Sequence, residues 1–336
     1  MQFPIPLPHL STQSMASKKQ IAAASSSGLM PWLKLMRLPT VFTALSNVLC
    51  GYYVSGESRH LPDIVAQPAL WLLVLASAGL YLGGMVLNDV FDADLDAAER
   101  PERPIPSGAI SKRAAAIFGT LLMAIGITSA WFAGKSSESG STSVVIAVGL
   151  AAMVVLYDSV LKNTIAAPVG MATCRFLNVM LGASCSVIGR QWAWEANPAL
   201  WVAVALGVYV FGVTWFARHE TGEARRSALA TGLLISLSGI GVNAAAGWRT
   251  LAENRAAMGA LIALVLIAGN VGLRAVKAIR VNHPGLLQKT VGFMLLNIIF
   301  IDAAMTFCLT GSGRLATTVV ILVIPATLMK RVVPMS

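Results

Sequence analysis

The sequence predicts an all-α integral membrane protein with about nine or ten transmembrane helices. The composition gives two reasons, because 56% of the 336 residues are hydrophobic and only 12% are charged. An ordinary soluble domain carries about twice that charged fraction. The third reason is the pattern, since the apolar residues stand in long uninterrupted blocks that a soluble sandwich or barrel does not show.

The apolar blocks have the length that a membrane requires. A helix needs roughly 20 mostly apolar residues to cross the hydrocarbon core of a bilayer. The last block is the shortest and either spans the membrane, lies on its surface or re-enters it, which leaves the expected number of spans at about nine or ten. The candidate spans are residues 39–55, 69–89, 114–133, 143–161, 166–188, 199–217, 227–247, 258–278, 289–309 and 315–329.

We expect residues 31–336 to form a single polytopic membrane domain and residues 1–30 to form a disordered cytoplasmic tail. The first thirty residues are rich in Ser, Pro and Ala, contain no acidic side chain and have no long apolar core. They therefore do not resemble a secretory signal peptide. A basic, Ser-rich start is also compatible with an organelle transit peptide, although the tail is the favoured interpretation.

The basic residues predict the orientation of the chain in the membrane. If the N-terminus is inside and each span crosses once, most of the 25 Lys and Arg residues fall on the inner side, as the positive-inside rule requires. The net charge of +10 then reflects topology and contact with anionic membrane lipid, so we do not expect nucleic acid as a partner. The default location is a bacterial inner membrane, with the N-terminus in the cytoplasm.

An acidic motif at the end of the second candidate span carries the expected chemistry. Its first, fifth and ninth positions share one face of a helix, because they are four residues apart. Hard oxygen ligands on one face suit Mg²⁺, which takes one or two carboxylates and completes its shell with water and phosphate. We therefore expect a magnesium site here, and the alternative is a solvated acidic helix end. The expected ligands are Asn88, Asp89, Asp92 and Asp96.

A stiff, Pro-rich loop follows the acidic motif and carries Arg100 and Arg103. The planar guanidinium offers paired donors that match phosphate oxygens. A metal ion on one side and Arg103 on the other would suit a diphosphate. Taken alone, the loop is equally well interpreted as a positive-inside anchor.

Two further polar groups fall on the same side of the membrane. Tyr157, Asp158 and Lys162 end the fourth candidate span, and Arg175 and Asn178 lie about one turn apart in the fifth. An Arg inside an apolar helix does not face lipid and needs an anionic partner. That partner is either a protein carboxylate or a ligand phosphate, and we favour the phosphate.

The segment after the sixth candidate span holds a second acidic cluster, with His219, Glu220 and Glu223. Glu220 and Glu223 are candidate ligands of a second metal ion, and a salt-bridged loop is an equally good interpretation. Inside other spans, we expect hydrogen bonds between helices to account for the Asn residues. Asp302 is also intramembrane, but the sequence names no partner for it. The intramembrane Asn residues are Asn47, Asn243, Asn270 and Asn297.

These motifs resemble those of the UbiA-type intramembrane prenyltransferases. The pattern Asn-Asp-x-x-Asp-x-x-x-Asp over residues 88–96, followed by Arg103-Pro104 and Ser107-Gly108, is similar to the family's first motif. The segment from Tyr157 to Lys162 resembles its Tyr/Lys motif with one extra residue between the two. Arg37-Leu-Pro at the start of the first helix and Asn47 within it also resemble the family, and the resemblance covers residues 33–226.

The resemblance implies a fold and an activity. The family has nine helices in two four-helix halves around a central cavity, with two Asp-rich motifs facing each other at the cytoplasmic mouth. Mg²⁺ there bridges carboxylates and an isoprenoid diphosphate, the allylic C–O bond ionises, and a small aromatic or lipophilic acceptor attacks the cation. On this resemblance Asp92 and Asp96 are catalytic. The expected substrate-binding residues are Asn47, Arg103, Tyr157, Lys162, Arg175 and Asn178.

The second motif departs from the family pattern. Where the family carries several Asp residues, this chain has His219, Glu220 and Glu223. Glu still binds metal, but its extra methylene moves the oxygens, and His is a poor ligand of Mg²⁺. A non-catalytic UbiA-like protein that binds or transports a lipophilic metabolite is therefore the alternative. The intact first motif favours the enzyme, and clustering of the polar residues on one face argues against a channel.

Overall fold

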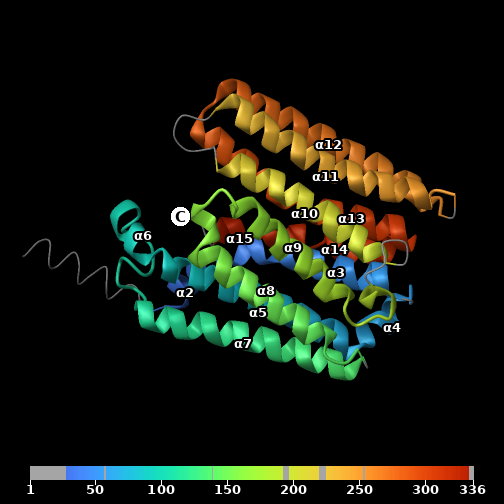
Figure 1. The fold of residues 1–336 in the computed structure, drawn as a ribbon, viewed down its shortest axis with the longest axis horizontal. Helices are drawn as coiled ribbons and strands as arrows, with labels where there is room; N and C mark the ends of the chain where they lie inside the picture. The colour runs from blue at the N-terminus through green and yellow to red at the C-terminus, as the bar shows by residue number, and fades with distance from the viewer. Residues whose placement is uncertain are drawn as a thin grey trace, which may run out of the picture.

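The computed structural model of the protein describes residues 28–56, 58–137, 139–191, 197–218, 225–252 and 254–332. Over these residues every regular element is helical (Figure 1). Residues 1–27 of the expected tail lie outside the described residues, and the first described helix begins at Leu29, within the range assigned to the tail. The elements, with η for 3-10 helices, are α2 (Leu29–Leu35), η1 (Leu38–Thr40), α3 (Val41–Ser55), α4 (Leu61–Ala66), α5 (Pro68–Phe91), α6 (Ala93–Glu99), α7 (Lys112–Ser136), α8 (Thr142–Ser159), η2 (Leu161–Asn163), α9 (Ala167–Ala183), η3 (Ile188–Arg190), α10 (Pro198–Ala217), α11 (Arg226–Thr250), α12 (Ala256–Val281), α13 (Pro284–Thr310), α14 (Gly313–Val320) and α15 (Val323–Val332).

The expected all-α membrane fold is confirmed. Eight helical segments of the described chain are long and apolar enough to cross a membrane. The last of them, Gly313–Lys330, is interrupted between α14 and α15. The expected spans at 39–55 and 166–188 correspond to α3 and α9, which have 15 and 17 residues. At about 1.5 Å per residue both are shorter than the hydrocarbon core of a bilayer.

The two short helices lie at the centre of the bundle, where protein surrounds them. Figure 1 shows α11 and α12 along one side, next to α10 and α13, and α7 along the opposite side, below α5 and α8. Between these layers α3 contacts α5, α9, α10 and α13. Large apolar side chains such as Leu121 on α7 and Leu273 on α12 are exposed, as expected for helices that face lipid.

Two glycines allow α3 and α9 to approach closely. A Cβ atom added at Gly51 would lie 2.0 Å from the carbonyl oxygen of Val179, and one at Gly182 would lie 2.1 Å from that of Val48. Small residues at such positions let helix backbones meet inside a membrane, where packing rather than water exclusion holds helices together. This contact, the α3–α9 seam, sets the distance between two helices that carry polar residues of the site.

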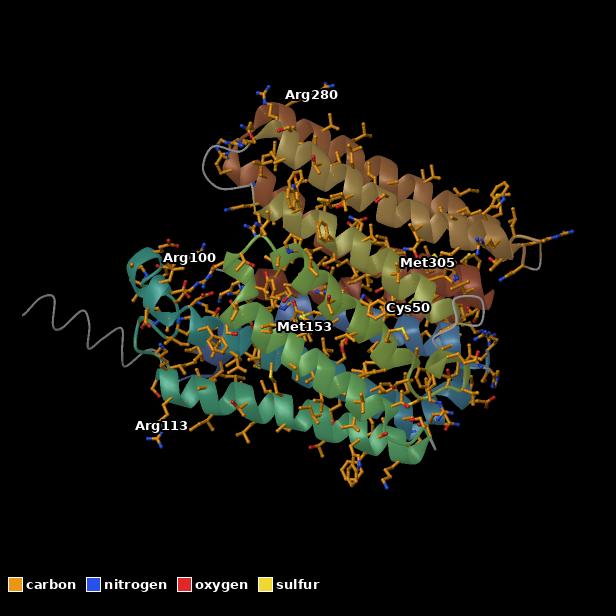
Figure 2. The ribbon with its side chains drawn as sticks, in the orientation of Figure 1. Cys50, Arg100, Arg113, Met153, Arg280 and Met305 are labelled. Carbon is orange, nitrogen blue, oxygen red and sulfur yellow. The ribbon has the colours of Figure 1, made fainter. Side chains whose placement is uncertain are left out.

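The acidic motif and much of the basic charge lie at one end of the bundle. Figure 2 shows Arg100, Arg113 and Arg280 at the same end of the bundle. Cys50 and Met305, also labelled there, are buried inside the bundle. The motif straddles a break, because α5 ends at Phe91 and α6 begins at Ala93. The helices α14 and α15 pack beside α3, η1 and α13.

Candidate functional site

A cavity of about 260 Å³ opens among α5, α8 and α9, beside η1 and α3. Its walls include apolar side chains, among them Leu80, Leu150, Val154 and Met171. Cavities that hold ligands combine such walls with a few placed polar groups. The polar side chains that line it are Arg37, Ser77, Tyr81, Asn88, Tyr157, Asp158, Arg175 and Asn178.

Beside the cavity, two carboxylates of the motif are paired with arginines. Arg37 donates to Asp89 Oδ1 at 2.6 Å, and Arg103 donates to Asp96 Oδ2 at 2.6 Å. The Arg103 nitrogen also lies 3.7 Å from Asp89. Asp96 and Arg103 are both buried, so each needs its partner to compensate the cost of leaving water. Asp89 and Asp96 can bind a metal ion, and Arg103 a diphosphate, only if these ion pairs open. Both roles stay predictions.

The third carboxylate of the motif belongs to a second group at the cavity. Lys162 Nζ lies 2.6 Å from Asp92 Oδ1. Asn88 donates through Nδ2 to Asp158 Oδ1 at 2.8 Å, and Asp92 is close enough to Asp158 for the two charges to interact. These contacts bring α5, α8 and η2 together. Tyr157 precedes Asp158 and lines the same cavity, as its expected substrate role requires.

Asp158 belongs to the site, although no role was predicted for it from the sequence. It is buried and lines the cavity. The available signal was its position, a carboxylate that ends an apolar span at a depth where charges are costly. Its link to Asn88 joins residues 70 positions apart, which no spacing rule reveals.

Arg175 lies deeper in the cavity wall and is held by neutral groups. It donates to Asn47 Oδ1 at 3.1 Å and to Thr43 Oγ1 at 3.0 Å. Its guanidinium carbon lies 5.4 Å from the centre of the Tyr81 ring, which is within reach of a cation–π contact. Asn47 in turn donates to Asp302 Oδ2 at 2.6 Å. The sequence named no partner for Asp302, and the structure supplies two, Ser46 and Asn47.

The other intramembrane Asn residues do not behave as expected. Asn297 donates to the carbonyl of Phe293 and Asn270 accepts from Arg274, so both bond within their own helices. The buried side chain of Asn243 has no hydrogen-bond partner among the described residues. Hydrogen bonds between helices thus account for Asn47 but not for these three.

Asn178 links three helices beside the cavity. It donates to the carbonyl of Ala44 at 2.8 Å and accepts from Ser77 at 2.8 Å. We expect Asn178→Ala to lower the free energy of unfolding by about 1 kcal/mol, as is typical of an interhelical hydrogen bond in a membrane. Thermal unfolding in detergent measures this. The control is Thr173→Ala on the same helix, because within the described part of the chain Thr173 bonds only to its own helix. Equal melting of the two variants would contradict the bridging role.

The oxygen donors at the cavity fit Mg²⁺ if water and phosphate supply the rest of its ligands. Over the described ranges, no group of three or more His, Cys, Asp or Glu residues is placed to hold a metal ion. Asn88, Asp92 and Asp158 instead offer two carboxylates and one amide oxygen. This set matches a magnesium ion that takes one or two carboxylates from the protein and its other ligands from water and phosphate. Glu220 and Glu223 lie outside the described residues, so the second metal site stays a prediction.

The comparison with protein families decides what kind of protein carries this site. A model of the UbiA prenyltransferase family matches residues 44–299. The chain belongs to the UbiA prenyltransferase family. The match includes the motif, the α3–α9 seam and every residue that lines the cavity except Arg37, whereas α14 and α15 follow it.

Curated relatives in the UbiA family are similar over part of the chain. The digeranylgeranylglyceryl phosphate synthase of Metallosphaera sedula is 33% identical over 134 residues, which are 40% of this chain and 43% of the relative. That of Methanopyrus kandleri is 30% identical over 171 residues, 51% of this chain and 56% of the relative. The chain thus spans about half the length of these curated relatives.

Solved structures share the UbiA fold over more of the chain. A structure described as digeranylgeranylglyceryl phosphate synthase matches with a TM-score of 0.57 at 18% identity, over 84% of this chain and 99% of that chain. A UbiA homologue from Archaeoglobus fulgidus bound to GPP and Mg²⁺ matches with a TM-score of 0.53 at 13% identity, over 79% and 99%. At these identities the likeness shows the fold.

Proposed function

We propose that this chain transfers an isoprenoid group from a prenyl diphosphate to a small aromatic or lipophilic acceptor, in a reaction that depends on Mg²⁺. One observation carries the proposal: a cavity with apolar walls brings together Asn88, Asp158 and Arg175, with Asp92 and Lys162 beside them. Oxygen donors for a metal ion and cations for a diphosphate thus meet next to space for an apolar chain.

Magnesium would be held by Asn88, Asp92 and Asp158 together with oxygens of the diphosphate. When bound, the ion neutralises the charge that builds on the leaving diphosphate. The Archaeoglobus fulgidus homologue, solved with GPP and Mg²⁺, supports the proposed need for magnesium. The pair Asp96–Arg103 would brace the end of α5 and the loop that follows it.

Two cations of the chain would bind the diphosphate. Lys162 is paired with Asp92. With Asp92 turned to magnesium, the Lys162 ammonium group would be left to bind a phosphate oxygen. Arg175 lies further inside and has no ion pair to break among the described residues. Apolar side chains such as Leu80 and Val154 would surround the isoprenoid chain and keep water away from the allylic cation.

A turnover assay tests the proposal. Purified protein in detergent is supplied with geranyl diphosphate and, in separate reactions, with geranylgeranylglyceryl phosphate or an aromatic acceptor. We expect release of diphosphate and formation of a prenylated product with Mg²⁺, and neither with excess chelator. Tight binding of geranyl diphosphate without turnover for any acceptor would favour the alternative, a UbiA-like protein that binds or moves a lipophilic metabolite.

We also propose that the protein lies in the inner membrane of a bacterial cell. The end of the bundle that carries the acidic motif would then face the cytoplasm. The gathering of Arg100, Arg113 and Arg280 at this end supports the orientation. Arg113→Cys is expected to react with a membrane-impermeant maleimide in inverted vesicles and not in right-side-out vesicles. Ser58→Cys, exposed beyond the far end of α3, is expected to give the reverse. The opposite pattern would overturn the orientation.

A further inference from the structure

Asp302 is a buried carboxylate that the proposed reaction does not use. It lies in α13 and is 0% exposed. Its Oδ2 atom accepts two hydrogen bonds at 2.6 Å, from Ser46 Oγ and from Asn47 Nδ2. Its Oδ1 atom has no hydrogen-bond partner among the described residues. A carboxylate inside a membrane protein is costly and is usually tied to function, so its contacts with α3 call for an explanation.

The Asn47 amide connects this carboxylate to the cavity. One end donates from Nδ2 to Asp302, and the other end accepts at Oδ1 from Arg175. An ionised carboxylate can only accept hydrogen bonds and a guanidinium can only donate them. Only one orientation of the amide satisfies both neighbours. Rotated by half a turn, the amide would turn its carbonyl towards Asp302 and its NH₂ group towards Arg175, and both bonds would be lost.

Arg175 differs in its partners from the other cations near the cavity. Arg37 is paired directly with Asp89, and Lys162 with Asp92. Within the described chain, Arg175 has only neutral contacts, namely Thr43, Asn47 and the Tyr81 ring. Its positive charge is thus held in the cavity wall without being cancelled by an adjacent carboxylate. The carboxyl group of Asp302 stands one residue further away, behind Asn47.

We propose that Asp302 is a positioning residue, which orients the Asn47 amide so that Arg175 is held ready for the diphosphate of the substrate. This inference rests on the proposed function, because it takes a diphosphate as the ligand of Arg175. It assigns Asp302 no contact with the substrate. Its effect on binding passes entirely through Asn47 and Arg175, and this property can be measured.

A double-mutant cycle tests the proposal, with binding of geranyl diphosphate in the presence of Mg²⁺ as the readout. Asp302→Asn removes the negative charge and the acceptor-only character of this neighbour, so the hydrogen bond that holds the Asn47 amide from the α13 side is weakened. We expect Asp302→Asn and Arg175→Ala each to weaken binding about tenfold, within the range known for residues of one hydrogen-bond network. The double variant should bind no more weakly than Arg175→Ala alone. Independent losses that multiply in the double variant would overturn the proposal.

Two further variants separate positioning from stability. Thr306→Val is the control, because Thr306 bonds to the backbone carbonyl of Asp302 and not to its carboxyl group. This variant should bind geranyl diphosphate at the wild-type level. The exchange Asn47→Asp with Asp302→Asn keeps one carboxylate in the network but sets it directly against Arg175. We expect it to fold, yet to bind about tenfold more weakly than wild type because the adjacent carboxylate cancels the guanidinium charge. Wild-type affinity in the exchange variant would overturn the proposal.

Failure of this inference is distinguishable from failure of the proposed function. If the wild-type protein binds no geranyl diphosphate, the proposed function fails at the first measurement. The same double-mutant cycle is then measured with the Tm of thermal unfolding as the readout in place of binding. Asp302→Asn should lower the Tm by less in the Arg175→Ala background than in wild type, because the two residues act in one network. Equal Tm losses in the two backgrounds would overturn the link between Asp302 and Arg175.

Discussion

Asp92→Asn is expected to abolish the Mg²⁺ dependence of prenyl diphosphate binding while the protein stays folded in the membrane. The amide keeps the shape of the side chain but removes its negative charge. The remaining donors, Asn88 and Asp158, would then hold a metal ion poorly. We expect the affinity measured with Mg²⁺ to fall by about 100-fold or more, the scale on which preorganised electrostatic groups act.

The same substitution frees Lys162 from its ion pair. Residual binding of geranyl diphosphate to Asp92→Asn should therefore be equal with and without Mg²⁺. Asp94→Asn is the matched control, since Asp94 lies two residues further along the chain and has a side chain that is 94% exposed. Among the described residues, it is paired only with Lys112. It should bind as wild type does. Mg²⁺-dependent binding retained in Asp92→Asn would show that the metal assignment is wrong.

Gly182→Val is expected to prevent α3 and α9 from packing. A Cβ atom at this position would lie 2.1 Å from the carbonyl oxygen of Val48, and a backbone atom cannot move aside as a side chain does. The two helices would have to separate, and Arg175 on α9 would move away from Asn47 on α3. We expect the free energy of unfolding to fall by about 3 kcal/mol or more, at the upper end of overpacking effects.

Gly149→Val on α8 provides the control for this prediction. A Cβ atom at Gly149 would have no atom within 4 Å, so the added side chain meets open space. Thermal unfolding and gel filtration in detergent compare the two variants. If Gly182→Val remained monodisperse and melted at the wild-type temperature, the close approach of α3 and α9 would be contradicted.

The acidic motif could be predicted from the sequence, but the partner of each carboxylate could not. The spacing of Asn88, Asp92 and Asp96 predicted a single helix face, but the helix breaks at Asp92. α5 carries Asn88 to the cavity wall, and Asp96 lies beyond the break on α6. The break after Phe91 and the return of the loop place Arg103 against Asp96, so that pair is buried beside the cavity. The ion pairs result from the packing of the loop and of η2 against the end of α5, which local spacing does not encode.

The partner of Arg175 shows the same limit. Its position inside an apolar helix predicted that it needs a polar environment, and the phosphate was the favoured anion. The protein supplies Thr43 and Asn47 from α3, and a carboxylate only behind Asn47. Thr43 lies one turn before Asn47 on the same helix face. The sequence therefore held a signal for it, but no signal that this face meets α9.

By itself the sequence determined the class of fold, the approximate spans and the end of the bundle that carries the chemistry. It does so because lipid forces each span to satisfy its own backbone hydrogen bonds, so that length and hydropathy are local properties of the chain. The tertiary structure decided the partners. Asn88 with Asp158, Asp92 with Lys162, and Arg175 with Asn47 join different elements. These pairs depend on how closely the helices approach, which is a property of the packed bundle and not of any one segment.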